Sequence, residues 1–203
     1  MDEIVLRGIA KWPNVPAVYG WLSLNRRGQW LIKGERISNP RVTAFIGRNY
    51  EHDERGRWFF QNGPQRVFVA LDYMPLIYRV VNLDRAPLAL ECHTGRQVAT
   101  VSGGWLDEAG TLLLETEHGV GIVHDRDLGR LFPYLIDANG TVLDEDVLVE
   151  VMALLQQQRA APLWLRFHED NVKVEPILSS DVPRRFGFLS RPGWKNALEP
   201  RER

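Results

Sequence analysis

Residues 53–60 read DERGRWFF, in which an aspartate stands three positions before a glycine and a block of large apolar side chains follows. The same arrangement recurs as NRRGQWLI at 25–32, DEAGTLLL at 107–114 and DANGTVLD at 137–144. Asp and Asn side chains hydrogen-bond the nearby backbone, and glycine adopts a positive φ without steric cost, so this spacing is typical of a tight turn. Because apolar residues flank each copy, the four copies predict four β-hairpin turns.

The spacing of these turns predicts a tandem duplication. Their glycines stand at positions 28, 56, 110 and 140, so the first pair recurs after shifts of 82 and 84 residues, and the tripeptide GWL recurs at 20–22 and 104–106. The alternative is chance recurrence, because such turns are common in β proteins.

Helix signals lie between the turns of each pair. Asn39-Pro40 is a good N-cap and first helical position for a helix that follows, and Asp125 or Asp127 could cap a second helix that Pro133 would end. Residues 144–159 combine an acidic first turn with helical spacing of apolar residues, which predicts an inserted helix there. We expect the N-terminal segment, with its prolines, to run irregularly over the surface.

Strand signals fill most of the remaining chain. Residues 66–71 with 76–81, and 163–168 with 172–177, are interpreted as equivalent hairpins, and a further hairpin is expected around 94–96. The predicted fold class is α+β, mainly antiparallel β with a few helices, in two tandem related β-rich halves.

The charge distribution divides the chain into three parts. Residues 1–86 form a basic first half of net charge +5, residues 87–180 an acidic second half of −9, and residues 181–203 a basic tail of +3. The two halves could attract one another within a chain or between chains of a homo-oligomer, or the difference could be ordinary surface variation screened by salt. The tail is either a frayed terminus or a docked arm that buries its aromatic residues, Phe186, Phe188 and Trp194.

Composition favours a soluble cytoplasmic protein. The chain has 203 residues, of which 44% are hydrophobic, so it can bury a sizeable core. No apolar run approaches the roughly 20 residues that a membrane helix needs, so no membrane partner is expected. The single cysteine, Cys92, fits a reducing compartment.

The candidate binding residues combine arginines and amides in the first half. They carry donors suited to a carboxylate, a phosphate or a peptide backbone, and thus to a small anionic ligand or a protein partner. Nucleic acid is disfavoured by the pI near 6.5 and by strand alternation, which turns some of the interleaved aromatics into the core. The candidates are Arg48, Tyr50, Arg57, Gln61, Gln65 and Arg66.

No catalytic constellation is evident in the sequence. It lacks the GxSxG, Walker A and GxGxxG motifs, and Cys92 and His93 should point to opposite faces of a strand. We therefore assign no catalytic residue, metal ligand or cofactor, and expect a non-catalytic binding or interaction protein. The alternative is a small-molecule enzyme, metal-assisted in one version, that uses the region of His118, His124 and Asp125.

Three segments carry a family resemblance. KWPNVPAVYGWLSL at 11–24, FIGRNY at 45–50 and FFQNGPQRVFV at 59–69 together resemble a family of uncharacterised proteobacterial proteins of about this length. The resemblance implies a bacterial cytoplasmic protein and carries over no activity, ligand or catalytic residue.

Overall fold

The computed structural model describes residues 1–12, 14–81 and 87–193, which form two compact units. Unit 1 comprises Met1–Asn25, Gln29–Tyr73 and the chain from Gly187 onward, and unit 2 comprises Arg26–Gly28 and Met74–Phe186. The boundary near Tyr73 differs from the predicted division at residue 86.

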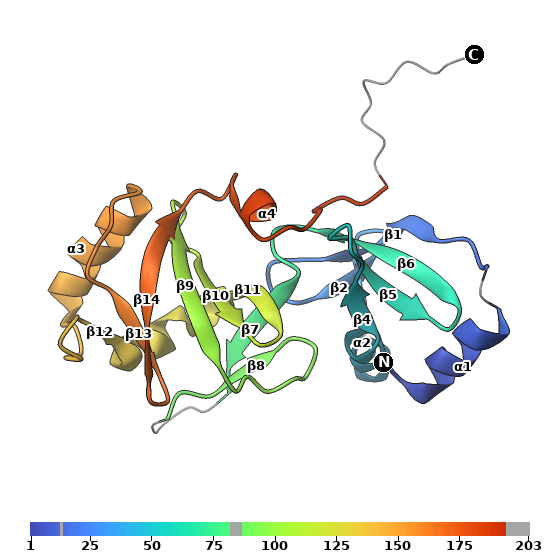
Figure 1. Ribbon diagram of the computed structural model, residues 1–203, viewed down its shortest axis with the longest axis horizontal. Helices are drawn as coiled ribbons and strands as arrows, with labels where there is room; N and C mark the ends of the chain where they lie inside the picture. Colours follow the sequence, from blue (N-terminus) through green and yellow to red (C-terminus); the bar gives the residue numbers. More distant parts are fainter. Residues whose placement is uncertain (13, 82–86, 194–203) are drawn as a thin grey trace, which may run out of the picture. The chain divides into compact units, whose positions relative to one another are not determined.

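Unit 1 is a six-stranded mixed sheet with α2 packed on one face (Figure 1). The strand order is β3-β2-β1-β6-β5-β4, in which β1 and β6 are parallel and the other neighbours antiparallel. Its elements are α1 (Glu3–Lys11), β1 (Val18–Leu24), β2 (Trp30–Ile32), β3 (Glu35–Arg36), α2 (Pro40–Arg48), β4 (Tyr50–His52), β5 (Trp58–Asn62) and β6 (Gln65–Leu71).

Aromatic side chains dominate the core of unit 1. The ring of Tyr50 meets Trp30 edge-on at 4.9 Å between centroids and Trp58 at 4.8 Å. Phe45 of α2 meets Phe60 of β5 edge-on at 5.6 Å, which fixes the helix on the sheet.

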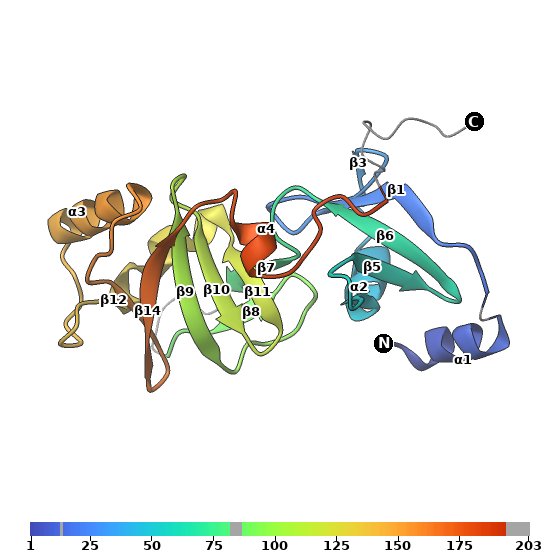
Figure 2. The same cartoon turned by 45° about the horizontal axis from the view of Figure 1, so that its top comes forward.

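Unit 2 is an eight-stranded mixed sheet, in which α3 packs on β9 and β14 (Figures 1 and 2). The strand order is β12-β13-β14-β9-β10-β11-β7-β8, with parallel pairs β14–β9 and β11–β7. Its elements are β7 (Leu76–Val80), β8 (Leu90–Cys92), β9 (Val101–Asp107), β10 (Leu112–Thr116), β11 (Gly119–Val123), the 3-10 helix η1 (Asp125–Tyr134), β12 (Leu135–Ile136), α3 (Glu145–Gln156), β13 (Trp164–Phe167), β14 (Asp170–Ile177) and α4 (Val182–Arg185).

The four predicted turns are confirmed. Gly28, Gly56, Gly110 and Gly140 all have positive φ, between 70° and 81°. The Asx side chain at each turn accepts backbone N–H groups; Asp53 Oδ1, for example, accepts from the residues two and four positions later at 3.1 and 3.0 Å. The turn chemistry read from the sequence is therefore the chemistry that the chain uses.

Six strands of unit 2 repeat the order and directions of the unit 1 sheet. From β11 to β12 the order β11-β10-β9-β14-β13-β12 matches β3-β2-β1-β6-β5-β4 strand for strand, with the same parallel central pair. The registers also agree: Leu24 pairs with Trp30 and Leu71, while Leu106 pairs with Leu112 and Pro176. Unit 2 adds β7, β8 and α3 to this shared frame. The equivalent pairs used below are Ile32 with Leu114, Phe60 with Leu165, Asn62 with Phe167, Gln65 with Asp170, and Val67 with Val172.

The two GWL tripeptides are not equivalent in the structure. Leu22 pairs with Val69 and Gly104 with Val174, so the register equates Leu22 with Gly104 rather than with Leu106. The β1 strand contains an irregularity between Val18 and Leu22, and the tripeptide match is displaced by two positions.

Several predicted elements are corrected. The α+β class with mainly antiparallel strands is confirmed, but neither sheet is purely antiparallel, because β1–β6, β9–β14 and β7–β11 pair in parallel. The predicted hairpin of 66–71 with 76–81 is wrong, since β6 and β7 lie in different sheets. The sheet to which a strand belongs is decided by hydrogen bonds to strands that are distant in the sequence, and a local sequence pattern does not indicate those partners.

The helix predictions hold with differences. Asn39 caps α2 and Asp144 caps α3, each with a side-chain acceptor, as expected. The second helix is a 3-10 helix that His124 rather than an aspartate caps, and it contains Pro133. The N-terminal residues form α1, whose periodicity the nearby prolines obscured.

The C-terminal segment is docked as far as residue 193. Phe188 is buried, and Leu71 N donates to Ser190 O at 2.7 Å. The ring of Phe186 meets Trp105 at 5.0 Å. Trp194, the third predicted aromatic of the arm, lies outside the described residues. Within the described ranges, no helix is both long and apolar enough to span a membrane.

Candidate functional site: an apolar cleft in unit 1

A cleft of about 460 Å³ opens beside α2 on the sheet of unit 1. This volume lies within the range of about 300–1,000 Å³ that is typical of small-molecule sites. Its lining is apolar except for two amides, and consists of Val18, Trp21, Leu22, Ile32, Val42, Phe45, Ile46, Phe60, Asn62, Gln65 and Val67.

A bulge in β1 shapes one wall of the cleft. Two adjacent residues, Trp21 and Leu22, both line it, although neighbours on a regular strand point to opposite faces. The register of β1 against β6 shifts between Val18 and Leu22, and Gly20 has a φ of 74° that a side chain would strain. The bulge therefore turns Trp21 toward the cleft, a use of bulges that is common beside binding sites.

The opposite wall is the apolar stripe of α2. Val42, Phe45 and Ile46 stand at i, i+3 and i+4, which places them on one face of the helix. The Asn39 side chain accepts from Arg41 N at 2.9 Å and from Val42 N at 3.4 Å, and so fixes the first turn. Ile46 is buried, whereas Val42 is 40% exposed at the rim.

Polar groups gather at one edge of the cleft. Asn62 and Gln65 are cross-strand partners at the ends of β5 and β6, and Gln65 Nε2 donates to Pro16 O at 3.2 Å. On another side, the ammonium of Lys33 lies 4.1 Å from the ring centroid of Trp21. The cleft thus combines an apolar interior with two amide groups at one edge, and the Lys33 ammonium contacts the ring of one lining residue, Trp21.

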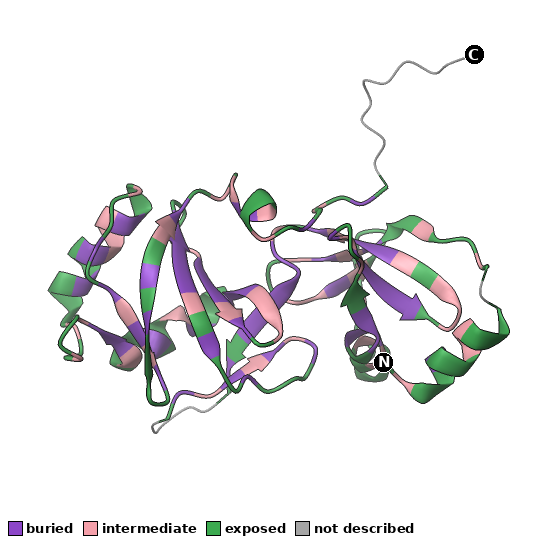
Figure 3. Ribbon diagram, viewed as in Figure 1, coloured by how far each residue is buried: buried purple, intermediate pink, exposed green. Residues whose placement is uncertain are grey.

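Some of the equivalent positions in unit 2 are more buried, although Asp170, the counterpart of Gln65, is exposed. Ile32 is 46% exposed, whereas its counterpart Leu114 is fully buried. Phe167 and Val172, the counterparts of Asn62 and Val67, are buried as well, although Asn62 is exposed and Val67 half-buried. Figure 3 shows buried, half-buried and exposed residues along the strands of both units. Unit 1 therefore leaves Ile32, Asn62 and Val67 more exposed than unit 2 leaves their counterparts.

Of the six predicted binding residues, only Gln65 lines the cleft. Arg48 forms an ion pair with Asp2 at 3.1 Å, which ties α2 to the N-terminal segment. The ring of Tyr50 belongs to the buried aromatic core. Gln61 is also buried, and its Nε2 donates to Gly63 O at 2.8 Å inside the β5–β6 turn.

The other two predicted arginines lie on the opposite face of the sheet. Arg66 alternates with Gln65 and Val67 along β6, and its guanidinium lies 4.6 Å from the Phe59 centroid. Arg57 pairs with Asp53 at 2.6 Å and lies over Phe68. The Asp53 carboxylate has a lowered pKa, for which its hydrogen bonds to Arg57 outweigh its burial. The six residues therefore form no single site.

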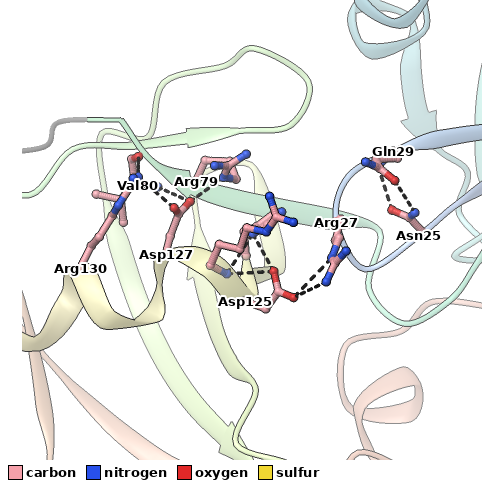
Figure 4. Close-up of polar contacts among 10 residues, drawn as sticks. Asn25, Arg27, Gln29, Arg79, Val80, Asp125, Asp127 and Arg130 are labelled. Carbon is pink, nitrogen blue, oxygen red and sulfur yellow. Dashed lines mark hydrogen bonds and ion pairs between the residues drawn. The ribbon is translucent and has the colours of Figure 1, made fainter. Parts of the chain in front are cut away.

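Unit 2 contains a buried carboxylate held by two arginines (Figure 4). Asp127 is 1% exposed and accepts from Arg79 Nε at 2.5 Å, Arg130 Nη1 at 3.0 Å and Val80 N at 3.3 Å. The bonds from Arg79 and Val80 fasten η1 to β7, whereas the bond from Arg130 lies within η1. Because the donors already surround the carboxylate, the cluster is structural.

The histidines of the alternative enzyme hypothesis do not assemble. His118 and His124 lie at opposite ends of β11, about 20 Å apart along a strand that rises about 3.3 Å per residue. His118 Nε2 lies 2.8 Å from Gln97 O, and His124 Nδ1 lies 2.9 Å from Asp125 Oδ1. Burial, with Arg79 adding to it, lowers the pKa of His124. The described residues contain no group of three or more His, Cys, Asp or Glu placed to hold a metal ion.

The main cleft residues were not identified from the sequence. The helical spacing of Val42, Phe45 and Ile46 was the available signal, but such a stripe equally describes a buried helix face. The position of Trp21 in the cleft lining depends on the β1 bulge, which no local sequence pattern predicted.

Sequence comparison with known families identifies the family of this chain. Residues 1–193 match the sequence profile of DUF2944, described as "Protein of unknown function (DUF2946)". The chain belongs to the DUF2944 family. No curated protein matches this DUF2944 chain in sequence.

Two solved structures from a second family are similar. A DUF1285 family protein from Silicibacter pomeroyi DSS-3 has a TM-score of 0.55 at 14% identity, over 83% of this chain and 87% of its own. A DUF1285 family protein from Shewanella baltica OS155 has a TM-score of 0.42 at 16% identity, over 54% of this chain and 88% of its own. The first likeness extends to the fold alone.

Proposed function

We propose that the protein is a non-catalytic small-molecule-binding protein of the bacterial cytoplasm, and that the unit 1 cleft is its ligand site. The observation that carries the proposal is the open apolar cleft itself, of about 460 Å³ between α2 and the sheet. The lone cysteine, which is free and buried, fits a reducing compartment.

The repeated frame supports a binding role. We infer that the two units arose by tandem duplication, since they share strand order, strand direction and register. Unit 2 buries the counterparts of Ile32 and Val67, so the shared strand arrangement does not require these two residues to be exposed in unit 1. An exposed concave apolar surface favours the binding of an apolar ligand, because binding removes the apolar surface of both from water.

The direct test is binding of an apolar fluorescent probe to the full chain. Anilinonaphthalene sulfonate should bind at one saturable site, and Ile32→Glu should weaken this binding at least about tenfold, because the added charge would have to be desolvated. Ile32 is 46% exposed, so the substitution leaves the core intact.

The matched control is Val142→Glu in unit 2, where the valine is also 46% exposed but lies outside the cleft. This variant should bind the probe as the natural chain does. Equal loss in both variants, or no saturable binding to the natural chain, would refute the cleft as the ligand site.

A further inference from the structure

We infer that the ligand of the unit 1 cleft is a carboxylic acid with an apolar tail, whose carboxylate binds the amides of Asn62 and Gln65. The inference rests on the proposed function and names the chemical class of its ligand. Amide N–H groups donate hydrogen bonds to a carboxylate, and an apolar tail suits the remaining lining.

The two amides converge by strand pairing. Asn62 and Gln65 are directly opposite residues of β5 and β6, and both line the cleft. Opposite residues have Cβ atoms about 4.5–5.5 Å apart on one face, so the two amides can reach one carboxylate. The bond from Gln65 Nε2 to Pro16 O uses one of its two N–H groups and orients the other.

The shared strand arrangement does not require a polar residue at the position of Asn62, although it has one, Asp170, at the position of Gln65. In unit 2 the equivalent of Asn62 is Phe167, which is 1% exposed. An apolar residue therefore suits the sheet at that place. Unit 1 has an amide there, beside an otherwise apolar cleft, where a hydrogen-bonding ligand would use it.

The charges around the cleft favour an anion. The Lys33 ammonium lies against the Trp21 ring, which is itself part of the lining. None of the described residues that line the cleft is acidic. A carboxylate bound by the two amides would thus meet no opposing carboxylate among the residues that line the cleft.

The cleft volume bounds the length of the tail. A water-sized group occupies about 30 Å³, so a space of about 460 Å³ holds roughly fifteen such groups. A medium-chain acid such as decanoate meets this limit with its head and tail together.

The test compares ligands that share a tail and differ in the head. Isothermal titration of the full chain with decanoate, decanol and decylammonium should give the highest affinity for decanoate and the lowest for decylammonium. Asn62→Leu and Gln65→Leu should each weaken decanoate binding about tenfold or more, equivalent to about 1.4 kcal/mol, and change decanol binding by less than about threefold.

The control is Gln157→Leu, which removes an exposed amide of unit 2 and should leave all three affinities unchanged. Equal affinity for decanoate and decanol, with the fluorescent probe displaced by both, would overturn the carboxylate assignment while the cleft remained a ligand site. Displacement of the probe by an apolar helical peptide but by no decyl compound would overturn the small-molecule class. No probe binding at all would instead refute the proposed function.

Discussion

Removing the Asp127 carboxylate tests the interpretation of the buried cluster of unit 2. Asp127→Ala deletes three hydrogen bonds, two of them from arginines, and leaves the buried Val80 N–H without this acceptor. The arginine side chains are 44% and 43% exposed, so water can solvate them, which reduces their share of the loss. An unpaired buried N–H costs about 1–3 kcal/mol, and we expect a total loss of about 2–4 kcal/mol in the free energy of unfolding.

The assay is urea denaturation of the full chain, with Asp125→Ala as the control. Asp125 also pairs with an arginine, Arg27, at 3.1 Å, but its side chain is 55% exposed. Exposed pairs contribute about 0–1 kcal/mol, so the control should barely move the midpoint. Asp127→Asn should cost less than Asp127→Ala, since the amide oxygen still accepts from Val80. Equal midpoints for Asp127→Ala and Asp125→Ala would refute the structural role of the cluster.

Three further predictions concern stability. Burial lowers the pKa of His93 to about 3. Below about pH 6.5 the unfolded state therefore binds a proton that the folded state does not. The free energy of unfolding should then fall by up to about 1.4 kcal/mol for each pH unit between pH 6.5 and 5. In denaturation series across this range His93→Gln should show a smaller fall, and an unchanged slope would contradict the assignment. Leu155→Ala should lower the free energy of unfolding by about 2–5 kcal/mol, and Leu154→Ala should lower it clearly less, because Leu155 is fully buried and Leu154 only half-buried. Equal urea midpoints for the two variants would contradict this packing of α3. Gly56→Ala should destabilise the fold more than Gly34→Ala, since both glycines have positive φ but only at Gly56 would a Cβ meet the Gly187 carbonyl oxygen. Thermal unfolding measures the difference, and equal melting temperatures would contradict docking of the C-terminal segment.

The amino-acid sequence by itself determined the local features of the fold. The Asx-to-glycine spacing specified all four turns, because the hydrogen bonds lie within five residues of one another. Asn39 and Asp144 likewise marked the starts of α2 and α3, since capping satisfies N–H groups of the same turn. The predominance of hairpin strand signals, with only a few helix signals, was sufficient for the fold class.

Only the tertiary structure decided which distant strands pair and where the cleft opens. The parallel pairing of β1 with β6 joins residues more than 40 positions apart, and the sequence of neither strand indicates which strand it pairs with. The bulge at Gly20 and the half-covered face beside Ile32 depend on that pairing. Burial is a property of what packs on a residue, so the place of Gln65 and Trp21 in the cleft lining is known only from the folded chain, although the hydrogen-bonding chemistry of Gln65 had already made it a candidate.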